Sequence, residues 1–156
     1  MDIHPCYAGI GSRSTPYPIL DQMEAWGMYL FSEAYHLRSG GASGADSAFE
    51  RYVPDYAKEI YLPWKGFNGN TSNLYPPSDE AFKLASMFHP NWDACSRVAK
   101  LFHARNSHQI LGPDLCDPVD FVICWTPGGV TTGGTGQALR IATACDIPII
   151  NLGKAS

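Results

Sequence analysis

The sequence predicts an α/β protein of the Rossmann-like kind, in which a mainly parallel sheet of five strands lies between two layers of helices. Short apolar segments alternate along the chain with longer segments of helical periodicity, which is typical of a parallel sheet covered on both faces. In addition, three glycine-rich segments each follow an expected strand and precede an expected helix. Together these observations predict a three-layer α/β/α architecture.

The individual elements follow from the same two periodicities. Strands are expected over residues 6–10, 36–39, 58–64, 120–125 and 147–152. Helices are expected over residues 20–34, 45–53, 79–88, 91–102 and 137–145, and the fourth is expected to extend toward residues 103–109. The segment 120–125 is apolar throughout, apart from its first residue, as expected for a strand buried on both faces. The polar connection over residues 63–78 is interpreted as a lid over a site, with a surface excursion as the alternative.

Length and composition limit the number of domains and the kinds of partner that this protein can have. A chain of 156 residues with 45% hydrophobic residues fits a single domain over residues 1–156. No apolar run approaches the roughly 20 residues of a membrane-spanning helix, and the first residues lack the layout of a signal peptide. We therefore expect a cytoplasmic protein without a membrane partner. The net charge of −4 and the scattered Lys and Arg residues give a nucleic-acid partner weak support.

The cysteines and histidines show no ligand motif. The five cysteines form no CxxC pair, and the five histidines form no HExxH pattern. Cys6, Cys124 and Cys145 lie in or beside apolar runs and are expected to be packing residues, whereas Cys95 and Cys116 suggest no chemistry. The sequence thus predicts no metal site.

The three glycine-rich segments are "GIGSRS", "SGGASGAD" and "TPGGVTTGGTG", over residues 9–14, 39–46 and 126–136. Because the carboxyl ends of parallel strands share one sheet edge, these segments are expected to converge there. Glycine lets backbone N–H groups approach an anion, and a helix N-terminus behind it favours phosphate. The alternative is that each glycine only permits a turn or close packing.

Two common nucleotide motifs are absent. The chain has no GxxxxGK[ST] motif, which excludes a P-loop NTPase on pattern. Ser14 stands where a dinucleotide fingerprint has its third glycine, and no acidic residue ends the second expected strand. NAD bound in the ordinary Rossmann manner is therefore not expected, and no cofactor is predicted.

Several of these motifs resemble known families. "GIGSRSTP" followed by "LRSGGASGAD" resembles the first two strands of the DNA-processing protein A (Smf) family. "DFVICWTPGG" with "GGTGQAL" resembles the phosphate loop of the lysine-decarboxylase-like LOG phosphoribohydrolases. Both families belong to the SLOG superfamily of Rossmann-like nucleotide-binding proteins, and the chain resembles its short stand-alone members from phages and bacteria.

The glycine corners and this resemblance predict the site. The residues expected to bind ligand or phosphate are Gly11, Ser12, Arg13, Ser39, Gly40, Gly41, Gly44, Arg105, Gly128, Gly129, Gly133, Gly134 and Thr135. Asn106, beside Arg105, is a further candidate, and Arg105 is a match for an arginine of LOG enzymes. The position of the LOG catalytic glutamate is Ala138 here.

Asp46 and Glu50 are the candidate catalytic carboxylates. They are four residues apart on one expected helix, so both are expected to face the same side. A carboxylate near the ribose would be needed to cleave an N-glycosidic bond. In the alternative interpretation, Asp46 only stabilises the helix start through the dipole and Glu50 is solvated.

The sequence predicts binding of a phosphate-bearing nucleotide or nucleotide-derived ligand, with signalling nucleotides included in that class. One alternative is a LOG-like N-glycosidase acting on nucleoside 5′-monophosphates, and another is a DNA-processing protein A-like binder of single-stranded DNA. Whether the protein is an enzyme stays open. A homo-oligomer is expected by analogy with related folds.

Overall fold

The structure, a computed structural model, describes residues 4–154. Its sheet contains five parallel strands in the order β3-β2-β1-β4-β5. The strands are β1 (Cys6–Gly9), β2 (His36–Ser39), β3 (Lys58–Ile60), β4 (Phe121–Cys124) and β5 (Ile149–Asn151). The predicted fold class is therefore confirmed.

The order in which successive strands are added to the sheet reverses direction at β1. The strands β2 and β3 extend the sheet from one edge of β1, whereas β4 and β5 extend it from the other. Tyr7 accordingly pairs with Leu37 on one side and with Phe121 on the other. In an open parallel sheet, the carboxyl ends of the two strands at such a reversal leave a crevice between their following loops.

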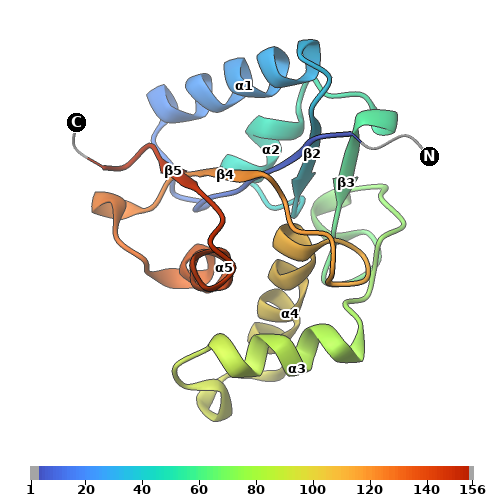
Figure 1. The fold of residues 1–156 in the computed structure, drawn as a ribbon, viewed down its shortest axis with the longest axis vertical. Helices are drawn as coiled ribbons and strands as arrows, with labels where there is room; N and C mark the ends of the chain where they lie inside the picture. Colours follow the sequence, from blue (N-terminus) through green and yellow to red (C-terminus); the bar gives the residue numbers. More distant parts are fainter. Residues whose placement is uncertain (1–3, 155–156) are drawn as a thin grey trace.

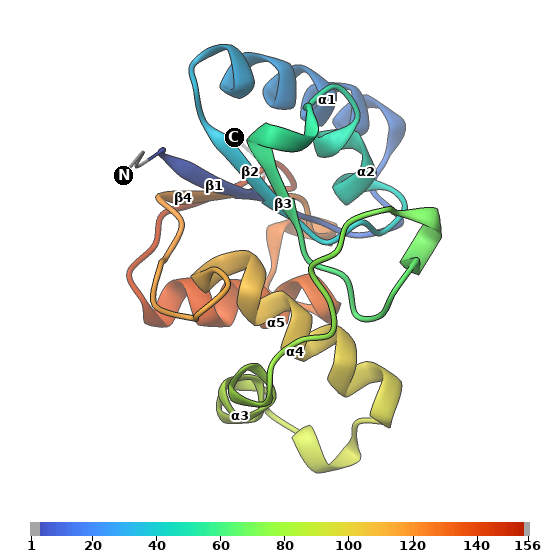
Figure 2. The ribbon, with the colours of Figure 1, turned by 90° about the vertical axis from the view of Figure 1, so that its right-hand side faces the viewer.

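Helices cover both faces of the sheet (Figures 1 and 2). The helices α1 (Tyr17–Ser32) and α2 (Ala45–Glu50) pack together on one face. The helices α4 (Arg97–Leu111) and α5 (Gly133–Ala144) pack together on the other. The helix α3 (Asp79–Phe88) lies outside α4, as Figure 2 shows, and forms the far end of the molecule.

Two apolar clusters lie on the two faces of the sheet. Met23 of α1 and Phe49 of α2 pack on one face with Tyr7. Ile110 of α4 and Ile141 of α5 pack on the other face with Val122, Ala8 and their neighbours. Burial of these side chains, at roughly 25 cal/mol per Å² of apolar surface, fixes α2, α4 and α5 against the sheet.

Several expected helix boundaries were wrong. The helix α4 begins at Arg97 and not at residue 91, because Ser96 is its N-cap and its Oγ accepts a hydrogen bond from Ala99 N at 3.1 Å. The helix continues to Leu111 and stops at Gly112, whose φ is +80°.

The helix α5 begins earlier than expected, at Gly133 instead of residue 137. Glycine is a poor helix former, so residue type does not indicate that three glycines, Gly133, Gly134 and Gly136, belong to the first turn of α5. The last glycine-rich segment is therefore partly helix and not only loop.

In the part of the chain that the structure describes, none of the helices combines the length and the apolar character that crossing a membrane requires.

Candidate functional site

A cleft of about 490 Å³ opens at the carboxyl edge of the sheet, where β1 and β4 separate. The loops that follow these two strands, the first turn of α5 and one face of α4 line it. The lining residues are Ile10, Gly11, Ser12, Arg13, Ser14, Ala42, Asp46, Phe67, Phe102, Arg105, Asn106, Gln109, Thr126, Pro127, Thr132, Gly133, Gly134, Thr135 and Ala138.

The loop after β1 contributes Arg13 and two hydroxyls. Ser12 Oγ and Ser14 Oγ are hydrogen-bonded at 2.7 Å, and Ser14 N donates to Ser12 Oγ at 3.0 Å. Gly44 has a φ of +84°, and a Cβ at this position would lie 2.8 Å from Arg13 Cα. Gly44 thus lets the second glycine corner pack against the first, while the Arg13 side chain stays exposed at the cleft.

The N-terminus of α5 faces the cleft through Gly133, Gly134 and Thr135. The N–H groups of a first helical turn have no acceptor within the helix, and they carry the positive end of the helix dipole. A Cβ at Gly134 would meet no atom within 4 Å, so the backbone of this turn is open.

Arg105 of α4 forms the inner wall. Its side chain is buried, and its Nη1 donates to the carbonyl oxygens of Gly40 at 2.5 Å and Tyr61 at 3.3 Å. Its guanidinium lies 5.4 Å from the ring centroid of Phe102 and 5.9 Å from that of Phe67. No acceptor for Nη2 occurs among residues 4–154, so this nitrogen is available to a ligand.

Asp46 lies near Arg105 and is also buried. Burial raises the pKa of the Asp46 carboxyl to about 6, although the charge of Arg105 and the hydrogen bond from Ala42 N oppose this shift. At pH 7 the cleft therefore contains one buried carboxylate beside one buried guanidinium.

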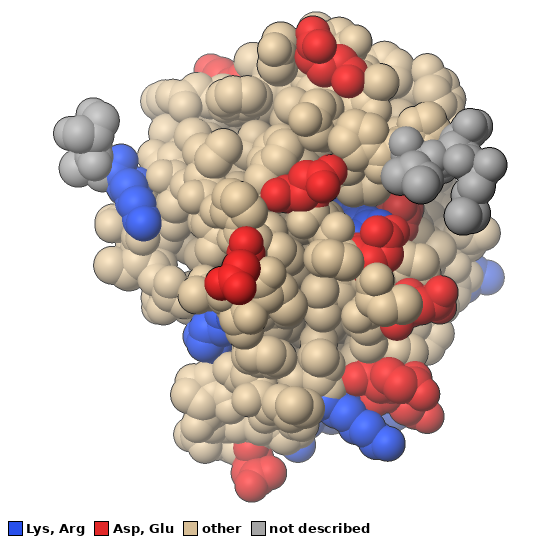
Figure 3. Space-filling view, in the orientation of Figure 1, with Lys and Arg blue, Asp and Glu red and all other residues tan. Residues whose placement is uncertain are grey.

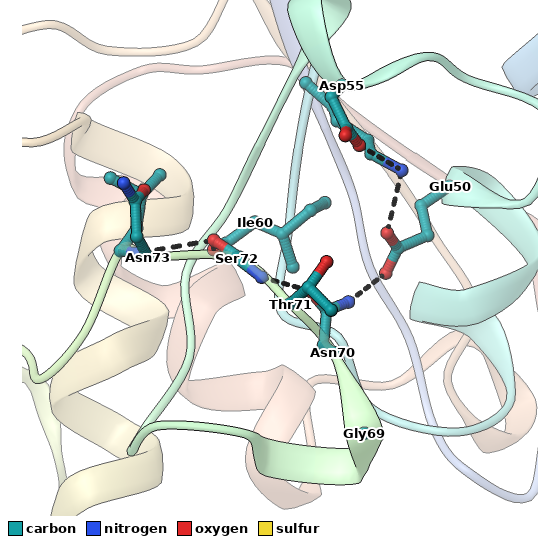
Figure 4. A pocket seen from close by; sticks show the side chains of 10 residues that line it. Glu50, Asp55, Ile60, Gly69, Asn70, Thr71, Ser72 and Asn73 are labelled. Carbon is teal, nitrogen blue, oxygen red and sulfur yellow. Dashed lines mark hydrogen bonds and ion pairs between the residues drawn. The ribbon is translucent and has the colours of Figure 1, made fainter.

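Glu50 lines a different hollow, of about 450 Å³, beside β3 (Figure 4). Its carboxylate pairs with Lys58 Nζ at 3.1 Å and accepts a hydrogen bond from Asn70 Nδ2 at 2.9 Å. Of the two carboxylates expected to act together, only Asp46 lines the cleft, and Glu50 has structural partners.

Seven of the predicted ligand residues line the cleft. They are Gly11, Ser12, Arg13, Arg105, Gly133, Gly134 and Thr135. Ser39, Gly40, Gly41, Gly44, Gly128 and Gly129 are not among the lining residues.

Most of the residues outside the cleft serve close packing, whereas Gly128 has a φ of +64° and a Cβ there would meet no atom within 4 Å, so it serves a turn. Ser39 Oγ donates to Gly9 O at 2.6 Å, and a Cβ at Gly40 would collide with the side chains of Gln109 and Arg105. A Cβ at Gly129 would collide with Lys154. Gly40 and Gly129 therefore agree with the alternative interpretation, in which a glycine permits close packing.

The sequence analysis missed Phe67, Phe102, Gln109, Ser14 and Thr126. Two of the missed residues, Phe102 and Gln109, could have been found from Arg105 by helical spacing, because residues 102, 105, 106 and 109 share one helix face. Asn106, already a candidate, donates from Nδ2 to Gly134 O at 3.0 Å and joins α4 to the first turn of α5.

The segment 63–78 forms one wall of the cleft. Phe67 reaches the cleft, and Asn68 Nδ2 donates to Gly41 O at 3.0 Å. Phe67, Trp64 and Phe102 pack edge to face, with ring centroids 5.3 to 5.5 Å apart. The segment is thus held against α4 by aromatic contacts, and it also lines the hollow beside Glu50.

Charged residues on the visible face are scattered. In Figure 3, acidic side chains are spread over this face, and the basic ones lie apart from one another and form no stripe.

The fold and cleft define a Rossmann-like α/β protein with a cleft at the reversal point of its sheet. No family model and no curated protein matches the chain. Among solved structures, it is similar to DNA processing protein A from Helicobacter pylori, described for its single-stranded DNA binding mode. The identity is 14%, the TM-score is 0.56, and the match covers 98% of this chain and 69% of that one. This likeness supports the expected fold resemblance, whereas resemblance to LOG enzymes and phage proteins stays a prediction.

Proposed function

We propose that the protein binds a phosphate-bearing nucleotide in this cleft, with a phosphate at the N-terminus of α5. The supporting observation is that the first turn of α5, with Gly133, Gly134 and Thr135, and two arginines from separate elements, Arg13 and Arg105, line one cavity. A helix N-terminus and a guanidinium are the donors that phosphate oxygens prefer.

The rest of the cleft fits the remainder of a nucleotide. Its volume of about 490 Å³ lies within the range of small-molecule sites. Phe67 and Phe102 offer aromatic surfaces for a base, and the Asp46 carboxylate offers an acceptor for a ribose hydroxyl or an exocyclic amine.

Hydrolysis of an N-glycosidic bond remains a narrower alternative. Among the described residues that line the cleft, Asp46 is the one carboxylic acid, and the position of the LOG glutamate is the buried Ala138. An enzyme of this kind would therefore depend on Asp46. Release of free base from a nucleoside monophosphate, abolished in Asp46→Asn, would identify it.

The first test measures melting temperature with nucleoside mono-, di- and cyclic phosphates, followed by mass spectrometry of each mixture. A ligand at a hundred times its Kd stabilises the folded state by about 2.7 kcal/mol, so binding raises the melting temperature. Arg13→Ala removes a charged donor worth about 1.5–3 kcal/mol and should weaken binding by about tenfold to a hundredfold.

Arg51→Ala is the matched control for that variant. Arg51 is also a surface arginine, and it pairs with Glu24 at 3.1 Å, outside the cleft. Equal weakening by both substitutions, or no stabilisation by any phosphate-bearing nucleotide, would contradict the proposal.

Single-stranded DNA is a second candidate ligand, favoured by the structural likeness to DNA processing protein A. The negative net charge implies few phosphate contacts. With about three contacts, affinity for an oligothymidylate should fall about 20-fold between 50 and 200 mM salt. Fluorescence anisotropy measures this dependence, and an affinity that does not change with salt would exclude the candidate.

A further inference from the structure

Three potential metal ligands meet where α3 is joined to α4, at the far end of the molecule. His89 follows α3 as its C-cap residue, Cys95 directly precedes the N-cap of α4, and His103 lies on α4 itself. One ligand atom from each residue lies within 4.8 Å of those from the other two.

The distances between these potential ligand atoms are close to those between the ligand atoms of a coordinated metal ion. Cys95 Sγ lies 3.6 Å from His89 Nε2, and the ring centroids of His89 and His103 are 4.5 Å apart. In a tetrahedral zinc site, with Zn–N of about 2.0–2.1 Å and Zn–S of about 2.3 Å, neighbouring ligand atoms lie about 3.3–3.7 Å apart. A shift of about 1 Å in side-chain positions would bring all three ligand atoms to the distances of a tetrahedral zinc site.

The histidines have free ring nitrogens. Asn91 N donates to His89 Nδ1 at 3.0 Å, which leaves Nε2 directed toward other partners, including Cys95 Sγ. His103 Nδ1 is buried and has no hydrogen-bond partner among the described residues. A buried polar atom without a partner is costly, and a coordinated ion would supply the missing partner.

Arg140 lies beside the three potential ligands, because its Nε donates to Phe88 O at 2.9 Å and Phe88 directly precedes His89. Arg140 repels a cation, and the thiolate that Cys95 becomes on coordination would offset this repulsion.

We propose that His89, Cys95 and His103 bind a Zn²⁺ ion, with the fourth position open to water. Two imidazoles and one thiolate are a ligand set suited to this ion. By binding His89 and Cys95 together with His103, the ion would hold the connection between α3 and α4 against the first turns of α4. It would thereby hold Phe102 and Arg105, the neighbours of His103 on α4, at the nucleotide cleft.

Sequence spacing did not predict this site. The three ligands are separated by six and eight residues and come from a helix end, a loop and a helix, so they match no compact motif. The expectation that Cys95 has no chemistry, and that the chain has no metal site, followed from motif spacing alone.

Titration of the metal-free protein with Co²⁺ tests the proposal, because a thiolate ligand gives tetrahedral Co²⁺ a near-ultraviolet charge-transfer band. We expect this band at one equivalent per chain, its loss when Zn²⁺ is added, and a higher melting temperature with Zn²⁺ than with EDTA. Cys95→Ser should abolish the band, and His89→Gln and His103→Asn should each weaken Co²⁺ binding by at least tenfold.

Cys116→Ser is the control, since Cys116 is an exposed cysteine of a different loop. The band should survive in this variant. Absence of a charge-transfer band in wild-type protein, its persistence in Cys95→Ser, or its loss in Cys116→Ser would overturn the proposal. Cys95 is only partly buried, so Cys95→Ser is expected to fold even if His103→Asn does not.

Discussion

At the scale of single residues, the cleft depends on a buried pair of opposite charges. Asp46 and Arg105 come from α2 and α4, on opposite faces of the sheet, and both are buried. Arg105 has compensating carbonyl acceptors, whereas Asp46 accepts a hydrogen bond of 3.3 Å from Ala42 N. Burial therefore destabilises the ionised carboxyl more than its partners stabilise it.

This imbalance predicts a pH dependence of stability. The pKa of Asp46 is about 6 in the folded protein against an ordinary value of 3.8. Between these values the folded chain holds the proton that the unfolded chain has released, so stability falls as pH rises, and the cost is complete above pH 6. The cost is about 3 kcal/mol at 1.36 kcal/mol per pKa unit.

Asp46→Asn should remove this dependence, because the amide stays neutral. We expect the difference in the free energy of unfolding, variant minus wild type, to grow between pH 4 and pH 7. Urea denaturation at several pH values measures it. A difference that stays constant over this range would contradict the raised pKa.

At the scale of elements, α4 connects the sheet, the cleft and the outer helix. One face carries Phe102, Arg105, Asn106 and Gln109 to the cleft, while other residues pack against α3 and α5. The first turn of α5 completes the cleft, and the Asn106 side chain fixes it to α4.

The openness of that turn leads to a prediction for Gly134→Ala. Alanine fits without a clash and is favoured over glycine in a helix by about 0.5–1 kcal/mol, so stability should be retained or improved. Because Gly134 lines the cleft, we expect the added methyl group to take space from a phosphate at this turn, so nucleotide binding should weaken. Thermal unfolding and ligand titration measure the two effects separately.

Gly40→Ala is the contrasting variant. Its methyl group would collide with Gln109 and Arg105, so the variant should lose stability as well as binding. If Gly134→Ala retained full nucleotide affinity, the phosphate would not lie at the N-terminus of α5.

At the scale of the whole molecule, the two apolar clusters share one sheet. Tyr7 and Ala8 are neighbours in β1 and belong to different clusters, on opposite faces. Loss of the sheet therefore removes the support of both helix layers. This arrangement favours one cooperative unfolding transition, as expected for a single domain.

We accordingly predict that far-UV circular dichroism and tryptophan fluorescence show the same unfolding midpoint. Trp26 and Trp125 pack on one face, whereas Trp64 contacts Phe102 of α4, so fluorescence samples both layers. Two separate midpoints would argue against a single cooperative domain. The expected homo-oligomer stays a prediction, which sedimentation velocity tests.

The sequence by itself determined the order and type of the elements and the approximate place of the candidate cleft. Apolar runs and helical periodicity indicated each strand and helix, because local patterning reflects which side chains are buried. Glycine clusters after strands indicated the sheet edge and thus Arg13 and the first turn of α5.

Only the tertiary structure decided which residues act together. It separated Glu50 from Asp46 by giving Glu50 the partners Lys58 and Asn70, and it assigned Gly40 to packing against Arg105. It also brought together His89, Cys95 and His103. The physical reason is that such contacts depend on how helices pack and where loops turn, which residue type and spacing do not specify.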